Sequence, residues 1–311
     1  MKTVVSIILV VACFLGLAFS TPAVVSYVFT IIDHPGAGRT EAFGINAAGD
    51  IVGAFLPSAG GLHGFLYRDG NFTTIDVPGA GGTAAFGINS AGQIVGFFID
   101  LTGTHGFLYS GGIFTTIDVP GSGIPGSGTV KLAATRAFGI NAAGEIVGSF
   151  DATSPDQTIT TTHGYLYSGG IFTIIDFPGA YFTEAFGINN AGEIVGSMSF
   201  PGVGGTSGFL YSRGTFTAIN NPNSSSPPPN PGDNLVTVAT GINDRGQIVG
   251  FFTDVGAYRG FVYERGSFTT IEPPGADTPN FALGINNAGH IVGYFNSATG
   301  EHGYLATPTR R

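Results

Sequence analysis

The chain has 311 residues, 52 of them glycine, and its formal net charge at pH 7 is −9. With only 11 lysine and arginine residues, this acidic chain is unsuited to bind nucleic acid or an anionic membrane surface. The single cysteine, Cys13, lies in the N-terminal leader described next, so disulfides and thiolate metal sites are excluded from the rest of the chain.

Residues 1–20 have the pattern of an export signal. Lys2 gives a positive start, residues 4–18 are almost wholly apolar, and a small-x-small cleavage motif ends at Ser20. We therefore expect a cleaved signal peptide and a secreted protein. Two alternatives stay open: a lipobox-like sequence in which Cys13 would be lipidated, and an apolar segment that is retained as an anchor.

Residues 21–311 are expected to form a single domain, because they repeat one motif from end to end. The fullest copy is AFGINAAGEIVG at residues 137–148. Its Gly-Ile-Asn core recurs at Gly44, Gly87, Gly139, Gly187, Gly241 and Gly284. A period of about 40–50 residues built from short strands indicates a β-propeller or a β-solenoid.

Each copy contains four short apolar segments separated by turn residues. In the second copy the segments are residues 86–89, 93–97, 105–109 and 113–118. They are rich in β-branched and aromatic residues, and no long window keeps a helical period, so they are predicted to be strands. The sequence therefore predicts an all-β protein built from four-stranded units.

The link between the third and fourth strands is a two-residue turn, such as Asp69-Gly70, which fixes the cross-strand register. Counting outward from this turn places His63 opposite Asp76. The same counting predicts His105 opposite Asp118, His163 opposite Asp176, Arg259 opposite Glu272 and Ser207 opposite Asn220. We expect a polar pair near one end of each hairpin.

The two ends of the chain complement each other. The C-terminal copy stops after three strands, and the chain begins with a segment of the fourth kind at residues 29–33. If this segment completes the last sheet, no exposed edge remains and Asp33 faces His302. We therefore predict a six-bladed β-propeller closed by the N-terminal strand, with an open solenoid as the alternative.

The motifs FTxIDxPG, AFGINxxGxIVG and HGFLY recur in this order from Phe29 to Leu305. In this respect the chain resembles the HAF-type extracellular repeat of bacterial secreted proteins. The resemblance implies export and a repeat fold, and it carries no settled activity. The chain departs from the pattern at Ser207 and Arg259, and at Thr240 and Leu283, which replace the phenylalanine before Gly-Ile.

The His–Asp pairs have two possible roles. Such a pair can orient an imidazole for catalysis or for metal binding, but here it recurs in several copies without a fixed serine or cysteine nucleophile. A structural hydrogen bond is the favoured interpretation. No known metal motif is present, so no cofactor is expected, although calcium held by acidic loops is an open alternative.

The loops supply the best indication of function. The links at residues 120–135, 151–162 and 220–236 are long, and in a propeller they emerge on one face. Candidate binding residues in or beside such links are Lys131, Arg136, Asp151, Asp156, Tyr181 and Phe182. We expect a monomeric, non-catalytic protein that binds a glycan, another ligand or a protein on this face. A polysaccharide hydrolase or lyase and a passive cell-envelope protein are the alternatives.

Overall fold

The structure is a computed structural model that describes residues 26–120, 131–202, 204–224 and 235–309, except 154–159. The predicted signal peptide, with Cys13, and the candidate residue Asp156 lie outside the described residues. Lys131 begins a strand, but its side chain is not described.

All regular secondary structure in the described residues is β, which confirms the predicted fold class. The strands of the first two units are β2 (Ala37–Ile45), β3 (Ile51–Pro57), β4 (His63–Arg68), β5 (Asn71–Ile75), β6 (Gly82–Ile88), β7 (Ile94–Ile99), β8 (Thr104–Ser110) and β9 (Ile113–Ile117). Next come β10 (Lys131–Ile140), β11 (Ile146–Thr153), β12 (Thr160–Ser168), β13 (Ile171–Ile174), β14 (Phe182–Ile188), β15 (Ile194–Ser199), β16 (Ser207–Ser212) and β17 (Thr215–Ile219). The last are β18 (Thr237–Ile242), β19 (Ile248–Asp254), β20 (Ala257–Glu264), β21 (Ser267–Ile271), β22 (Asp277–Ile285), β23 (Ile291–Ser297) and β24 (Gly300–Pro308), and the chain starts with β1 (Tyr27–Ile32).

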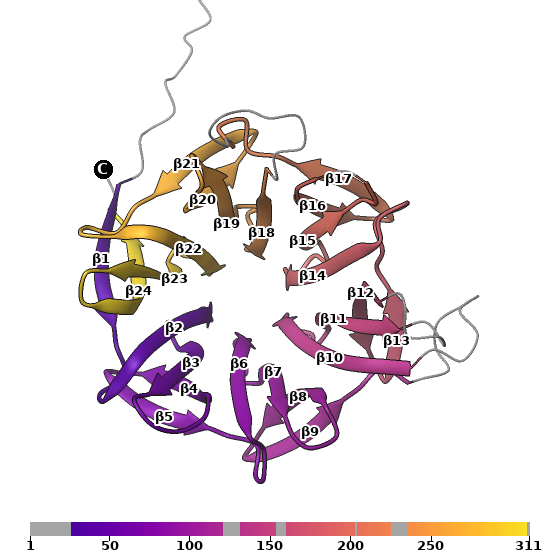
Figure 1. Ribbon diagram of the computed structural model, residues 1–311, viewed down its shortest axis with the longest axis horizontal. Helices are drawn as coiled ribbons and strands as arrows, with labels where there is room; N and C mark the ends of the chain where they lie inside the picture. The colour runs from indigo at the N-terminus through magenta and orange to yellow at the C-terminus, as the bar shows by residue number, and fades with distance from the viewer. Residues whose placement is uncertain (1–25, 121–130, 154–159, 203, 225–234, 310–311) are drawn as a thin grey trace, which may run out of the picture.

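The strands pair antiparallel in consecutive units of four, arranged around a central opening with the first strand of each unit innermost (Figure 1). Single parallel pairings link some neighbouring units, as between Arg39 and Glu301, so the hydrogen-bonded sheets contain eight, twelve and four strands. In the β4–β5 hairpin, Arg68 pairs with Asn71 and Tyr67 with Phe72, which is the register predicted from the turn.

The N-terminal strand β1 pairs with the C-terminal strand β24 and forms the outer edge of the β22–β24 unit (Figure 1). Phe29 is the partner of Ala306, and Ile32 is the partner of Gly303. The pairing predicted for residues 29–33 is therefore present, and β1 takes the place of the fourth strand that the C-terminal copy lacks.

The hydrophobic core lies between neighbouring units. A valine from the second strand of each unit packs into the cluster of the next unit, as Val52 does with Ile94 and Phe107. The last unit does the same with the first, where Val292 packs with Ile51 and Phe65. Because burial of each such side chain contributes about 1.5–3 kcal/mol, neighbouring units stabilise one another.

Glycine is required where the innermost strands approach each other. A Cβ atom on Gly139 would lie 2.7 Å from the carbonyl oxygen of Phe186 in the next unit, closer than packed atoms allow. The same crowding occurs between the last unit and the first, where a Cβ on Gly284 would lie 2.7 Å from the Phe43 oxygen. This close approach explains why the Gly-Ile-Asn core keeps its glycine in every copy.

Candidate functional site

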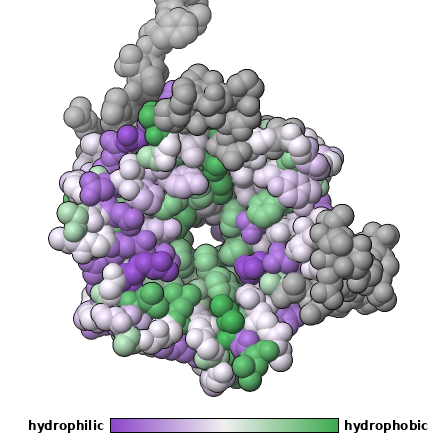
Figure 2. Space-filling model, in the orientation of Figure 1, coloured by the Kyte–Doolittle hydropathy of each residue, from purple (hydrophilic) through white to green (hydrophobic). Residues whose placement is uncertain are grey.

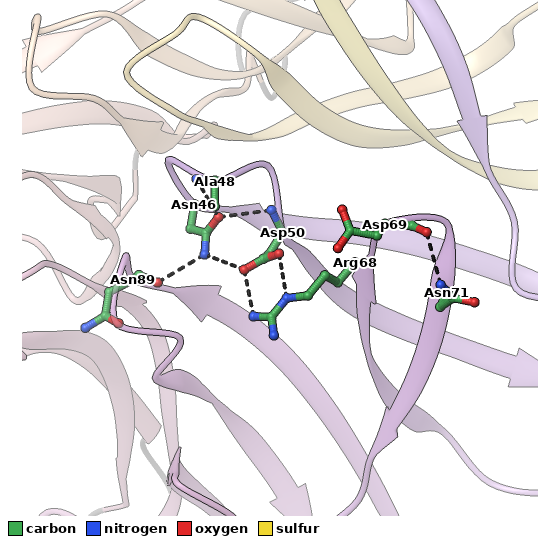
Figure 3. Close-up of polar contacts among 7 residues, drawn as sticks. All are labelled: Asn46, Ala48, Asp50, Arg68, Asp69, Asn71 and Asn89. Atoms are coloured by element: carbon green, nitrogen blue, oxygen red, sulfur yellow. Dashed lines mark hydrogen bonds and ion pairs between the residues drawn. The ribbon is translucent and has the colours of Figure 1, made fainter.

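The asparagine of each Gly-Ile-Asn core lies at one end of the central channel, beside the turn between the first and second strands. Figure 3 shows this turn and its hydrogen bonds for Asn46. The Asn46 Oδ1 atom accepts hydrogen bonds from the backbone N–H groups of Ala48 and Asp50, both at 3.0 Å. Its Nδ2 donates to the Asp50 carboxylate at 2.9 Å and to the carbonyl oxygen of Asn89, in the next unit, at 3.3 Å.

The bond from asparagine Nδ2 to the next carbonyl is repeated from unit to unit. The donors and acceptors are Asn89 to Asn141, Asn141 to Asn189, Asn189 to Asn243, Asn243 to Asn286, and Asn286 back to Asn46. In most units the asparagine Nδ2 donates its second bond to the side chain four positions later; these acceptors are Asp50, Gln93, Glu145, Glu193 and Gln247. Because each of these amides is satisfied by such bonds, we assign this end of the channel a structural role.

The opposite end of the channel is a cavity of about 280 Å³ that we call the channel mouth. Its lining residues are mostly aromatic: Phe43, Phe86, Phe138, Phe186, Thr240, Phe251, Phe281, Leu283 and Tyr294. The first four stand before Gly-Ile-Asn and so lie away from the asparagine turns. The mouth therefore opens on the face that carries the links into the first strands, which we call the loop face.

The aromatic rings of the mouth contact one another around its wall. Phe43 stacks on Phe86 with ring centroids 4.3 Å apart, and Phe281 lies 4.7 Å from Tyr294. In the last two units Thr240 and Leu283 stand in place of the repeated phenylalanine. There the aromatic rings of the mouth come from Phe251, Phe281 and Tyr294. Figure 2 shows the result: hydrophobic surface around the central opening, flanked by hydrophilic surface on two sides.

On one side of the mouth, β2 and β24 bring an arginine and two carboxyl groups together. The Arg39 Nε lies 3.1 Å from Glu301 Oε1 and 3.6 Å from Glu41 Oε1. Burial, repulsion from Glu301 and a hydrogen bond between the two carboxyl groups outweigh the attraction of Arg39 and raise the pKa of Glu41 to about 7. Glu41 lies two residues before Phe43 on β2, so this pair adjoins the mouth. Burial, and then the negative charges of Glu41 and Glu301, raise the pKa of Tyr294.

On the other side, β10, β11, β12 and β14 form a second polar cluster. The Arg136 Nη1 lies 3.1 Å from Asp151 Oδ2, and Thr162 Oγ1 donates to Asp151 Oδ1 at 3.0 Å. Glu184 accepts a bond of 3.2 Å from Ser149 Oγ, and its pKa is raised because burial outweighs that bond and the attraction of Arg136. Glu41 and Glu184 stand at equivalent positions, two residues before the phenylalanine of the mouth.

The binding residues expected from the sequence are only partly brought together. Arg136 and Asp151 form the ion pair just described. Tyr181 is 47% exposed, and its carbonyl accepts a bond from the N–H of Thr162, while Phe182 begins β14 and is half-buried. None of them lines the channel mouth. Lys131 and Asp156 take no part in this comparison, because the structure describes neither side chain.

The polar pairs lie at the outer hairpins. The imidazole Nδ1 atoms are 2.6–2.7 Å from carboxylate oxygens in the pairs His63–Asp76, His105–Asp118, His163–Asp176 and His302–Asp33, and Arg259 Nη1 lies 2.6 Å from Glu272. In the second unit the other ring nitrogen bonds Thr102 at 2.8 Å. An imidazole that is bonded at both nitrogens joins the strands of its hairpin, and it has no nitrogen free to act as a base or to bind a metal.

Arg39, Glu41, Glu301 and Glu184 were not predicted from the sequence as site residues, and neither was the aromatic wall. One signal was present: Glu41, Arg136 and Glu184 occupy a position that is Ala84 or Val238 in other copies. A charged residue at a repeat position that is apolar in other copies indicates a contact that only its own unit makes. The pairing of Glu41 with Glu301 had no sequence signal, because 260 residues separate them.

Within the ranges that the structure describes, no group of three or more His, Cys, Asp or Glu side chains is arranged to hold a metal ion. In the same part of the chain, no helix has the length and apolar character needed to cross a membrane.

Comparison with known proteins shows the fold alone. No protein family model and no curated protein matches the chain. A mutant of the Aleuria aurantia lectin in complex with Fucα1-6GlcNAc is similar over 90% of this chain and 97% of that one, with a TM-score of 0.51 and 13% identity. A gluconolactonase from Xanthomonas campestris covers 91% of this chain and 90% of its own, with a TM-score of 0.47 and 12% identity. The chain is an all-β protein whose structural neighbours are β-propellers.

Proposed function

We propose that the protein is a secreted, monomeric, six-bladed β-propeller, closed by its N-terminal strand, that binds a glycan without catalysis on its loop face. The pairing of β1 with β24 and the bond from Asn286 to Asn46 support closure. The export signal supports secretion, and the recurrent motifs support a place among HAF-type extracellular repeat proteins.

The observation that carries the binding function is the aromatic channel mouth beside Arg39, Glu41 and Glu301. Sugar rings present C–H faces that pack on aromatic rings and hydroxyl groups that bond to carboxylates and guanidinium groups. The mouth offers both kinds of contact in one place. The lectin of similar fold, in complex with a fucosyl disaccharide, is consistent with this use of the architecture.

The test is binding of the purified protein to a glycan array, followed by calorimetry with the best oligosaccharide and the variants Tyr294→Ala and Phe281→Ala. Loss of one stacked ring is expected to weaken binding by roughly tenfold or more, equivalent to at least about 1.4 kcal/mol. The matched control is Ile113→Ala, an exposed apolar residue in the β8–β9 hairpin, away from the mouth. Absence of glycan binding, or equal binding by the Tyr294 variant and the parent, contradicts the proposal.

A second candidate function, polysaccharide hydrolysis, is favoured by one specific feature. A protonated Glu41 beside a second carboxyl group has the character of a general acid near neutral pH. The same purified protein, incubated with a panel of polysaccharides, distinguishes the two functions. Product formation that Glu41→Gln abolishes identifies a hydrolase, and binding without product identifies a lectin-like protein.

A further inference from the structure

The fourth unit, β14–β17, lacks the side chains that fill one end of the hairpins in other units. In four of these units, a phenylalanine on the second strand faces a histidine on the third, which in turn bonds an aspartate; in the fifth unit the three residues are Phe252, Arg259 and Glu272. The trios are Phe55–His63–Asp76, Phe98–His105–Asp118, Phe150–His163–Asp176 and Phe295–His302–Asp33. In the fourth unit the same three positions hold Met198, Ser207 and Asn220.

These replacements coincide with a cavity. A space of about 370 Å³ lies in the fourth unit, and Met198, Ser207 and Asn220 all line it. In the second unit the imidazole of His105 packs 5.2 Å from the Phe98 ring and lies 2.7 Å from Asp118, so side chains occupy the corresponding position. Replacement of an imidazole by a serine hydroxymethyl group removes the largest part of this filling. We call the cavity the fourth-unit pocket.

The lining of the pocket combines apolar and neutral polar groups. Phe200 and Leu235 contribute apolar surface in addition to Met198. Ser207 and Asn220 contribute a hydroxyl and an amide to the lining. Among the lining residues that the structure describes there is no lysine, arginine, histidine or carboxylate. A ligand for this pocket is therefore uncharged, has an apolar face, and carries several groups that both donate and accept hydrogen bonds.

The pocket lies at the links before β16 and before β18, because Gly204 and Thr206 precede the one and Asn221 and Leu235 precede the other. These links belong to the loop face, on which the channel mouth also opens. The volume lies near the lower end of the range of roughly 300–1,000 Å³ for small-molecule pockets, which suits a single sugar ring rather than an oligosaccharide.

We propose that the fourth-unit pocket binds one neutral monosaccharide unit, at a site separate from the channel mouth. The ligand class follows from the neutral, hydroxyl- and amide-lined wall, and the inference rests on the proposed glycan-binding function only for its choice of a sugar over another neutral polyol. A branched or folded glycan that reaches both sites gains affinity from their common face.

The test uses a variant that restores the filling found in other units: Met198→Phe, Ser207→His and Asn220→Asp together. Its probes are the methyl glycosides of neutral hexoses, N-acetylhexosamines and 6-deoxyhexoses, with binding followed by saturation-transfer NMR and calorimetry. The proposal expects the parent to bind at least one of these monosaccharides and the filled variant to bind it at least tenfold more weakly. Asn220→Ala, at an exposed position that leaves folding intact, is expected to weaken binding several-fold.

The variant Tyr294→Ala distinguishes this site from the channel mouth. Retained monosaccharide binding by this variant, together with loss in the filled variant, supports the pocket. Equal binding by the parent, the filled variant and Asn220→Ala overturns it, as does a parent that binds none of the probes. Oligosaccharide binding that only Tyr294→Ala weakens overturns the pocket and leaves the function proposed for the mouth intact.

Discussion

The asparagine at the centre of each repeat gives the sharpest prediction, and Asn141 is the best position to change. Its Oδ1 accepts from the N–H groups of Ala143 and Glu145 at 3.0 Å, and its Nδ2 donates to Glu145 at 2.7 Å and to the Asn189 carbonyl at 3.2 Å. The side chain is buried. Replacement by alanine removes four hydrogen bonds at once and cuts the link to the next unit.

The expected loss of stability depends on which of these four bonds can be replaced by bonds to water or to other groups. The N–H of Ala143 lies at an exposed residue and can bind water, and the Asn189 carbonyl keeps its bond from Gly192. The N–H of Glu145 and the space left by the amide carry most of the cost. At about 1 kcal/mol per bond and with partial rehydration, Asn141→Ala should lower the free energy of unfolding by roughly 2–4 kcal/mol. That corresponds to a fall in Tm of roughly 5–10 °C for a domain of this size.

The assay is thermal and urea unfolding followed by circular dichroism, with the matched control Asn71→Ala. Asn71 is exposed and makes one bond, to the Asp69 carbonyl, so its replacement should change stability by less than about 0.5 kcal/mol. Asn141→Asp should be at least as destabilising as the alanine variant, because it places an oxygen against the Glu145 carboxylate and the Asn189 carbonyl. Equal stability of the Asn141 and Asn71 variants would refute the structural role of the asparagines.

Three further predictions concern crowding, protonation and the hairpin pairs. Gly139→Ala forces a Cβ against the Phe186 carbonyl and should cost roughly 1–3 kcal/mol in chemical unfolding, whereas Gly38→Ala, with its nearest atom at 3.8 Å, should be neutral. The pKa of Glu41 is raised from about 4.5 to about 7, so its contribution to stability is fully present below about pH 4.5 and is lost as the pH rises through about 7. Glu41→Gln should therefore flatten the fall in Tm between pH 5 and pH 8. An unchanged slope would contradict the burial of this carboxyl group. Asp118→Ala, at a pair whose side chains are 21% and 39% exposed, should cost no more than about 1 kcal/mol, and a larger loss would show that the pair does more than clasp a hairpin.

Local features of the chain were well predicted from the sequence because each repeat carries its own turn chemistry. Two-residue turns such as Asp69-Gly70 set the hairpin register, and the structure has the same partners. The asparagine turn is equally local, since Asn46 Oδ1 bonds the N–H groups of Ala48 and Asp50. These contacts lie within a few residues of each other, where spacing alone determines geometry.

Contacts between units were harder to predict. The bond from Asn46 to the Asn89 carbonyl joins residues 43 positions apart, and nothing in a single copy requires it. The carboxyl pair of Glu41 and Glu301 exists only because β2 and β24 lie side by side. The binding residues expected from loop length were correspondingly incomplete: Arg136 and Asp151 do meet, but the aromatic mouth was not among them.

The fourth-unit pocket was predictable from the sequence only in part. The joint change to Ser207 and Asn220 was visible in the sequence as a departure from the histidine–aspartate pair. Its consequence was not, because the third change, to Met198, lies on another strand, and only the strand pairing brings all three together. A departure from a repeat is most informative when the positions it affects are neighbours in space.

Closure of the ring by the N-terminal strand is the claim on which the rest depends, and a disulfide cross-link tests it most directly. Val28 and Thr307 are cross-strand partners on β1 and β24, so Val28→Cys with Thr307→Cys, in a Cys13→Ser background, should form an intramolecular disulfide in the monomer and raise the Tm. The control pair, Val28→Cys with Thr115→Cys on the outer strand β9 of another unit, should not cross-link within one chain. Failure of the first pair to close within the monomer, or equal cross-linking of both pairs, would contradict the closed ring.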